Sequence, residues 1–145
     1  MKHFIYIGLA ITMLACSAKE QPLTPQNLDQ YHGQWLVINY WAEWCKPCAE
    51  EIPELNALDQ RYSQVTVVGV NYDGASGLAL KQQEEKLGVE FGTLEADPAE
   101  TLGITRPRVL PTTLILNPEG KLATTLVGPQ TLISLARITG QMPEA

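Results

Sequence analysis

The sequence predicts an α/β domain whose central β-sheet is mixed and is flanked by helices on both faces. Two observations lead to this fold class. Apolar, β-branched runs alternate with segments of helical periodicity in the first half of the chain, and two further runs form a hairpin before a last helix. Alternation favours parallel strands, whereas a hairpin adds antiparallel ones. The 145 residues suit one domain with a substantial core.

The first strand and the helix after it are the most strongly marked elements. Gln34–Trp41 follows Gly33 and is rich in β-branched and aromatic residues, which predicts a buried strand. Apolar residues at spacings of three and four predict a helix over Ala49–Tyr62, kinked at Pro53 because proline lacks an amide hydrogen. Ahead of the strand, Leu28–Gln34 is expected to be a short helical or turn segment.

The remaining elements follow from the same patterns. Val65–Asn71 is predicted as a second buried strand, and Leu78–Leu87 as a helix with a polar outer face that ends at Gly88. Next we expect a short strand, a small helix, two strands of a hairpin and a last amphipathic helix. In order, these are Val89–Leu94, Pro98–Leu102, Thr112–Leu116, Lys121–Val127 and Gln130–Ile138.

The N-terminal residues are predicted to be a targeting segment outside the fold. We interpret residues 1–15 as a signal peptide, because a short basic start precedes the apolar run Phe4–Ala15, which is shorter than the bilayer span of about 20 residues. The end of this run resembles a bacterial lipoprotein signal, in which a cysteine, here Cys16, becomes the lipidated first residue. Met13 departs from that motif, which usually has Leu there. An ordinary cleaved signal or an uncleaved anchor is the alternative.

Cysteine usage agrees with this interpretation. Of the three cysteines, Cys45 and Cys48 form an obvious pair and Cys16 is left over, so lipidation would remove a free thiol. Residues 16–27 are mostly polar and include two prolines, and we predict a lipid-anchored tether there, followed by the folded domain over residues 28–145. Export would place this domain where disulfides persist.

Composition and charge exclude several classes of protein. The hydrophobic share of 45% and the charged share of 18% are typical of a globular domain, not of a disordered or membrane-spanning chain. The formal net charge is -6, and only Arg106 and Arg108 are close together among the basic residues. A nucleic acid is therefore not an expected partner, because binding phosphates needs clustered positive charge. Solubility alone explains the acidity.

The segment Trp41–Cys48 predicts the chemistry of the chain. It places two cysteines, separated by two residues, where the first strand meets the first helix. The amides and dipole of a helix N-terminus stabilise a thiolate, which favours dithiol chemistry at this junction. The alternative is a purely structural disulfide, but closing so small a loop constrains the unfolded chain only slightly.

Four segments together resemble a known family. Trp41–Cys48 resembles the active-site segment of thioredoxin-fold proteins, and Glu51–Leu55, Val68–Asn71 and Leu110–Thr113 are similar to the exported TlpA/ResA-like branch. The resemblance extends from about residue 28 to the C-terminus. It implies a thioredoxin-like fold and a thiol:disulfide oxidoreductase, more a reductase than an oxidant, with no cofactor or metal beyond the redox-active Cys45–Cys48 disulfide.

The resemblance also implies a division of labour between the two thiols. Cys45 would attack a substrate disulfide, and the more buried Cys48 would resolve the mixed disulfide. Trp44, Lys46 and Pro47 would lie on the substrate side of the motif, with Pro47 setting the first helical turn. The charge of Lys46 should favour the thiolate modestly, although Lys46 is equally well explained as a solvated surface residue.

Two further site residues are expected outside the motif. In thioredoxin-like folds the proline at Pro111 is cis and packs against the cysteine pair, exposing the backbone of Leu110 to an extended substrate and keeping metal ions off the thiols. A trans proline at a strand entry is the alternative. The segment Thr105–Arg108 makes this loop longer than in compact thioredoxins, so the substrate surface can be particular to this chain.

Glu51 is the expected proton partner of Cys48. Many thioredoxins carry a buried Asp on the preceding strand, where this chain has Asn39, which cannot titrate. Glu51 follows Cys48 by three residues and so shares its helix face, and burial would raise its pKa toward neutrality. The alternatives are an exposed carboxylate or one that complements the helix dipole; Glu50 is expected to face solvent.

The resemblance implies partners and a location. We expect a monomer that exchanges with protein thiols and disulfides, is re-reduced by a membrane electron donor, and is held by Cys16 on the periplasmic side of the bacterial envelope. A cytochrome c maturation reductase, an oxidase or an isomerase are rivals within this class. From another class, Cys45 and Cys48 could hold Cu(I) in a non-catalytic module, whereas two thiolates are too few for a closed zinc site.

Overall fold

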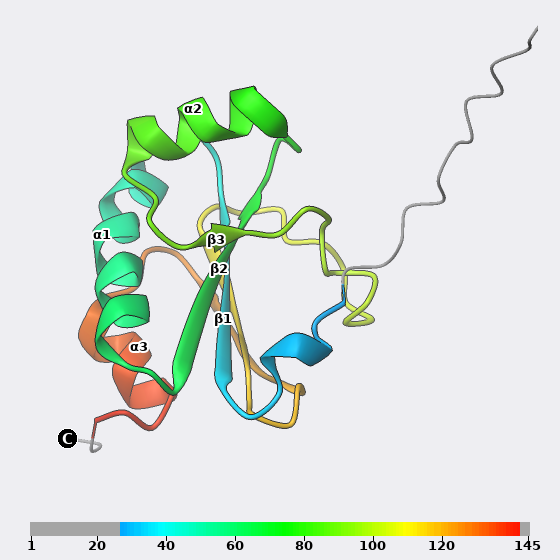
Figure 1. Ribbon diagram of the computed structural model, residues 1–145, viewed down its shortest axis with the longest axis vertical. Coiled ribbons are helices and arrows are strands. Elements are labelled where there is room, and N and C mark those ends of the chain that lie inside the picture. The colour runs from blue at the N-terminus through cyan, green and yellow to red at the C-terminus, as the bar shows by residue number, and fades with distance from the viewer. Residues whose placement is uncertain (1–26, 143–145) are drawn as a thin grey trace, which may run out of the picture.

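A five-stranded mixed sheet is the centre of the computed structural model, which describes residues 27–142 (Figure 1). Its strands lie in the order β3-β2-β1-β4-β5. β1 pairs in parallel with β2, as β2 does with β3, whereas β4 is antiparallel to both β1 and β5. The bounds are Trp35–Trp41 for β1, Val65–Asn71 for β2, Gly92–Thr93 for β3, Thr112–Leu116 for β4 and Leu122–Val127 for β5. This confirms the predicted mixed sheet.

The two faces of the sheet are covered differently. Helices α1 (Lys46–Arg61) and α3 (Leu132–Ile138) lie together on one face, to the left in Figure 1. The short 3-10 helix η1 (Asp29–Tyr31) and the irregular chain before β4 lie on the other, to the right. Helix α2 (Gly77–Leu87) crosses the top of this view. Helices therefore flank both faces, as predicted, but among residues 27–142 the helix on the second face is the single 3-10 turn η1.

Alternating side chains of β1 build two separate cores. Val37 packs with residues of α1 and α3, such as Ile52 and Leu135. Leu36 and Ile38 point the opposite way, into a core that η1 and the irregular chain complete. This follows from the two-residue period of a strand, which sends successive side chains to opposite faces.

The structure corrects several predicted bounds. The expected strand Val89–Leu94 shrinks to β3, and Pro98–Leu102 is not a helix but a set of turns, closed by a 2.9 Å bond from the Leu102 amide to the Pro98 carbonyl. Gly103 then takes a left-handed φ of 65°, which ends the helical turn. α1 begins at Lys46, three residues earlier than predicted, and continues through Pro53.

Two N-terminal predictions concern residues that the structure does not describe. The proposed signal peptide, Cys16 and all but the last residue of the proposed tether lie outside residues 27–142. Within that range, no helix is both long and apolar enough to cross a membrane.

Candidate active site

The cysteine pair lies at the junction of β1 and α1. Cys45 is the N-cap of α1, and its sulfur accepts a hydrogen bond from the Cys48 amide at 3.3 Å, because the first amides of a helix have no helical partner. The two cysteines form a disulfide. Cys45 is 4% exposed and Cys48 is fully buried, so the first thiol lies nearer the surface, as expected.

The rim of the pair is polar and aromatic. Trp44 is 67% exposed, and its indole nitrogen donates to Asp73 at 2.8 Å, which fixes the ring against the turn after β2. Lys46 extends into solvent, 4.0 Å from the Glu50 carboxylate. An ion pair this exposed contributes little energy. Pro47 is half-buried within the first turn of α1.

The segment Leu110–Pro111 reaches the cysteine pair through Leu110, although it is far away in sequence. The Leu110–Pro111 peptide bond is cis, as predicted. Leu110 packs on the apolar cluster that contains both cysteines and Trp41. The Pro111 carbonyl accepts from the Gly128 amide at 2.9 Å, which ties this loop to the end of β5. The structure therefore brings Leu110 to the cluster that contains Cys45.

Glu51 is fully buried on α1, which rules out the alternative of an exposed surface carboxylate. One oxygen, Oε1, accepts from the Gln130 backbone amide at 3.0 Å, and Oε2 accepts from Asn39 Nδ2 at 2.9 Å. Burial raises the pKa of Glu51 to about 7, although the bonds from Gln130, Asn39 and Thr113 act in the opposite direction. Glu51 can therefore exchange a proton near neutral pH. Glu50 faces solvent, as expected.

Thr113 and Gln130 complete this site, and the sequence analysis missed both. Asn39 Nδ2 also donates to Thr113 Oγ1 at 3.0 Å. Asn39 and Thr113 are direct partners in the β1–β4 register, so both side chains point to the same face as Glu51. Thr113 belongs to the family-like segment Leu110–Thr113, but only the register of the hairpin against β1 places it opposite Asn39. Gln130 acts through its backbone, which carries no signature in the sequence.

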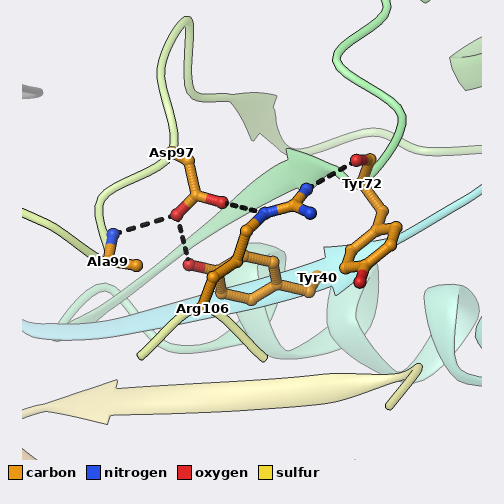
Figure 2. A network of polar contacts seen from close by, with 5 residues as sticks. All are labelled: Tyr40, Tyr72, Asp97, Ala99 and Arg106. Atoms are coloured by element: carbon orange, nitrogen blue, oxygen red, sulfur yellow. Dashed lines mark hydrogen bonds and ion pairs between the residues drawn. The ribbon is translucent and has the colours of Figure 1, made fainter. Parts of the chain in front are cut away.

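A second polar network, also missed by sequence, lies on the opposite face of β1 (Figure 2). Asp97 accepts from the Tyr40 hydroxyl at 2.7 Å, from the Ala99 amide at 2.9 Å and from Arg106 Nε at 2.6 Å. Arg106 also donates to the Tyr72 carbonyl at 2.6 Å and lies 4.0 Å from the centre of the Tyr72 ring. Burial alone would raise the pKa of Asp97, but these donors and the charge of Arg106 lower it.

This network connects the loop before Pro111 to the cysteines. Tyr72 packs against the cluster of Cys45 and Cys48, and it precedes Asp73, the partner of Trp44. Arg106 therefore holds the loop that leads to Pro111 against the turn that holds Trp44. Arg106 belongs to the segment Thr105–Arg108, and from there it reaches both Asp97 and the Tyr72 carbonyl.

The arrangement supplies the parts of a dithiol exchange site. A cysteine that caps the helix lies next to an accessible rim, a second cysteine lies one turn into the helix, and a buried carboxyl one turn further can take up a proton. Within residues 27–142, no group of three or more His, Cys, Asp or Glu side chains could hold a metal ion.

Known proteins resemble this chain in sequence. It matches the AhpC/TSA family over residues 12–125. It is similar to the thiol-disulfide oxidoreductase ResA of Bacillus subtilis (strain 168), with 33% identity over 106 residues, which are 72% of this chain and 59% of that protein. The chain spans about three fifths of the length of the first curated relatives that it matches.

Solved structures resemble it in fold. A DsbF homologue from Corynebacterium diphtheriae superposes with a TM-score of 0.64 at 24% identity, covering 78% of this chain and 74% of that one. A thioredoxin family protein from Chlorobium tepidum TLS gives 0.59 at 20% identity, covering 77% and 81%. The fold is therefore thioredoxin-like, as predicted.

Proposed function

We propose a function from the premise that this chain belongs to the AhpC/TSA family, in its ResA-like branch. The protein is a thiol:disulfide oxidoreductase that reduces protein disulfides. The observation that carries this proposal is the position of Cys45, which caps α1 beside the cis Leu110–Pro111 segment. A helix N-terminus stabilises a thiolate, and an extended substrate segment can pair with a backbone segment beside it.

The reaction has two exchange steps. The Cys45 thiolate attacks one sulfur of the substrate disulfide, which forms a mixed disulfide and releases the other substrate sulfur as a thiolate. The Cys48 thiolate then attacks Cys45 Sγ, which forms the Cys45–Cys48 disulfide and releases the second substrate thiolate. The substrate gains two electrons and the protein loses two, so an external dithiol must reduce the pair again.

Glu51 handles the proton of the second step. Cys48 must lose its proton before it attacks, and the Glu51 carboxylate, one helical turn away, accepts it and later returns it to a departing thiolate. The burial and raised pKa of Glu51 support this role. Trp44, Pro47 and the Leu110 backbone would contact the substrate, whereas Lys46 would act only through its charge.

The membrane tether and partners belong to the same proposal. The lipoprotein-like residues before Cys16 support anchoring on the periplasmic side of the envelope, with protein thiols as substrates and a membrane dithiol as electron donor. Incorporation of labelled palmitate tests the anchor. Label that persists in Cys16→Ser would contradict it.

Insulin reduction by the purified protein tests the activity. Dithiol-dependent turnover should occur in the wild type and in Cys16→Ser, the matched control, and should vanish in Cys45→Ser. Tight Cu(I) binding without turnover would instead favour the metal-binding module. The reduction potential tests the direction: about -270 mV fits a reductase, whereas about -120 mV would indicate an oxidase.

A further inference from the structure

The buried amide of Asn39 is only half satisfied. Its Nδ2 donates both to Glu51 Oε2 at 2.9 Å and to Thr113 Oγ1 at 3.0 Å. Its Oδ1 is equally buried, yet no donor among the described residues reaches it. A buried acceptor without a partner is unfavourable, so its retention next to a titrating group calls for a physical reason.

The two nitrogen donors at Glu51 suit its carboxylate form, whereas the Thr113 hydroxyl, which also bonds Glu51, can donate or accept. Oε1 faces the Gln130 amide and Oε2 faces Asn39 Nδ2, and both of these groups are donors. If Glu51 takes up a proton on Oε2, its new O–H group points at the N–H of Asn39, and neither can accept. A rigid amide would therefore oppose the uptake that the proposed function requires.

A half-turn of the Asn39 carboxamide removes this conflict. The turn exchanges Nδ2 and Oδ1, which have nearly the same size, within the same space. Oδ1 then accepts from protonated Glu51 Oε2, and it also accepts from the Thr113 hydroxyl, which can rotate to donate. Asn39 makes two hydrogen bonds in each orientation, and one of its two polar atoms lacks a partner in each. The amide therefore loses no bond of its own when Glu51 changes its protonation.

We propose that Asn39 is a positioning residue whose carboxamide turns over with the protonation of Glu51, donating to the carboxylate and accepting from the acid. This inference rests on the proposed role of Glu51 as proton carrier. An Asp at this position could only accept when ionised, and an apolar residue could do neither. The amide allows a buried carboxyl to exchange a proton without losing its hydrogen bond to Asn39.

The surroundings leave Glu51 as the group that drives the change. Asn39 on β1, Thr113 on β4 and the Gln130 backbone before α3 are neutral. On α1 itself, the titratable neighbours are Cys48, which is held in the disulfide, and Glu54, whose carboxylate accepts from the Leu132 amide at 2.7 Å. The one charged residue of α3, Arg137, is exposed.

NMR of the oxidised full chain tests the proposal. Contacts between the Asn39 amide protons and the Thr113 methyl group should be present above the Glu51 midpoint and lost below it, with the same midpoint as the Glu51 carboxyl carbon. Asn71 is an internal control, because its Nδ2 donates to Gln83 and its Oδ1 accepts from the Ala75 amide. Its contacts should not change with pH.

Glu51→Gln supplies the second measurement. Without a titrating group at position 51, the Asn39 contacts should become independent of pH. An unchanged Asn39 orientation across the wild-type midpoint, or a change that persists in Glu51→Gln, would overturn the proposal. The orientation of the amide is observed without turnover, so this inference can fail while the oxidoreductase function stands. Insulin reduction by the wild type and Cys45→Ser tests the function alone.

Discussion

Asn39 and Tyr40 are neighbours on β1, but their side chains point to opposite faces of the sheet, and each bonds a different carboxyl group. Glu51, on the helical face, has only neutral partners, and burial raises its pKa to about 7. Asp97, on the other face, has the Arg106 cation beside it, and its pKa is lowered although burial acts the other way.

The difference shows how one fold separates a proton carrier from a structural anchor. Burial raises the pKa of a carboxyl that has no counter-charge, and Glu51, one turn from Cys48, is such a group. A carboxyl paired with guanidinium stays ionised, so Asp97 keeps a constant hold on Tyr40 and Arg106.

Glu51→Gln should have the largest effect. The folded pKa, about 7, lies above the ordinary 4.5, so the folded state binds this proton more tightly. The stability that Glu51 contributes is complete below its unfolded pKa and is lost as the pH rises toward 7, by about 3 kcal/mol. The variant should lose this dependence in urea unfolding between these pH values, and its resolution step should slow. An unchanged pH profile of resolution would contradict the role.

Asp97→Asn should have the opposite pH dependence. The folded pKa of Asp97 is lowered, so its contribution is present above its usual value of 3.8 and is lost as the pH falls through the folded value. We expect the free energy of unfolding at pH 7 to fall by about 1–2 kcal/mol, because charged hydrogen bonds are lost. The difference from wild type should shrink in acid. A constant difference at every pH would argue against the ion pair.

Arg106→Lys should alter substrate binding more than chemistry. Lysine lacks the planar donors that reach both Asp97 and the Tyr72 carbonyl, so the loop before Pro111 should loosen. KM for a disulfide substrate should rise several-fold while kcat is kept, and stability should fall by about 1 kcal/mol. Arg108→Lys, in the same loop and exposed, is the matched control. Equal changes in KM and stability in both variants would show that Arg106 does not position the loop.

Lys46→Gln should have the smallest effect. The side chain is 89% exposed, and its partner Glu50 is 4.0 Å away, so screening by water leaves about 0.5 kcal/mol or less. Insulin reduction should therefore change by less than about threefold. A tenfold loss would show that this charge acts directly on Cys45.

The sequence identified the parts of the site that have local signatures. The cysteine pair marks a strand-to-helix junction, and Glu51 is set by helical spacing from Cys48. Asp97 could not be found this way, because it meets Tyr40 across 57 residues from an irregular segment. Gln130 contributes only its backbone, 79 residues beyond Glu51. Contacts of this kind depend on how the loops pack, which periodicity does not encode.

Periodicity alone also misplaced two helical segments. Pro98–Leu102 has the composition of a helix, yet Gly103 stops it after one turn. α1 begins early because the sulfur of Cys45 caps it, and sulfur is not among the usual capping groups.

The most direct test of this account is an NMR titration of the Glu51 carboxyl carbon in the oxidised protein, with Asp97 observed in the same experiment. The account predicts a midpoint near 7 for Glu51 and one below 3.8 for Asp97. A Glu51 midpoint at or below its ordinary 4.5 would contradict it, because the carboxyl could not then carry a proton for Cys48 near neutral pH.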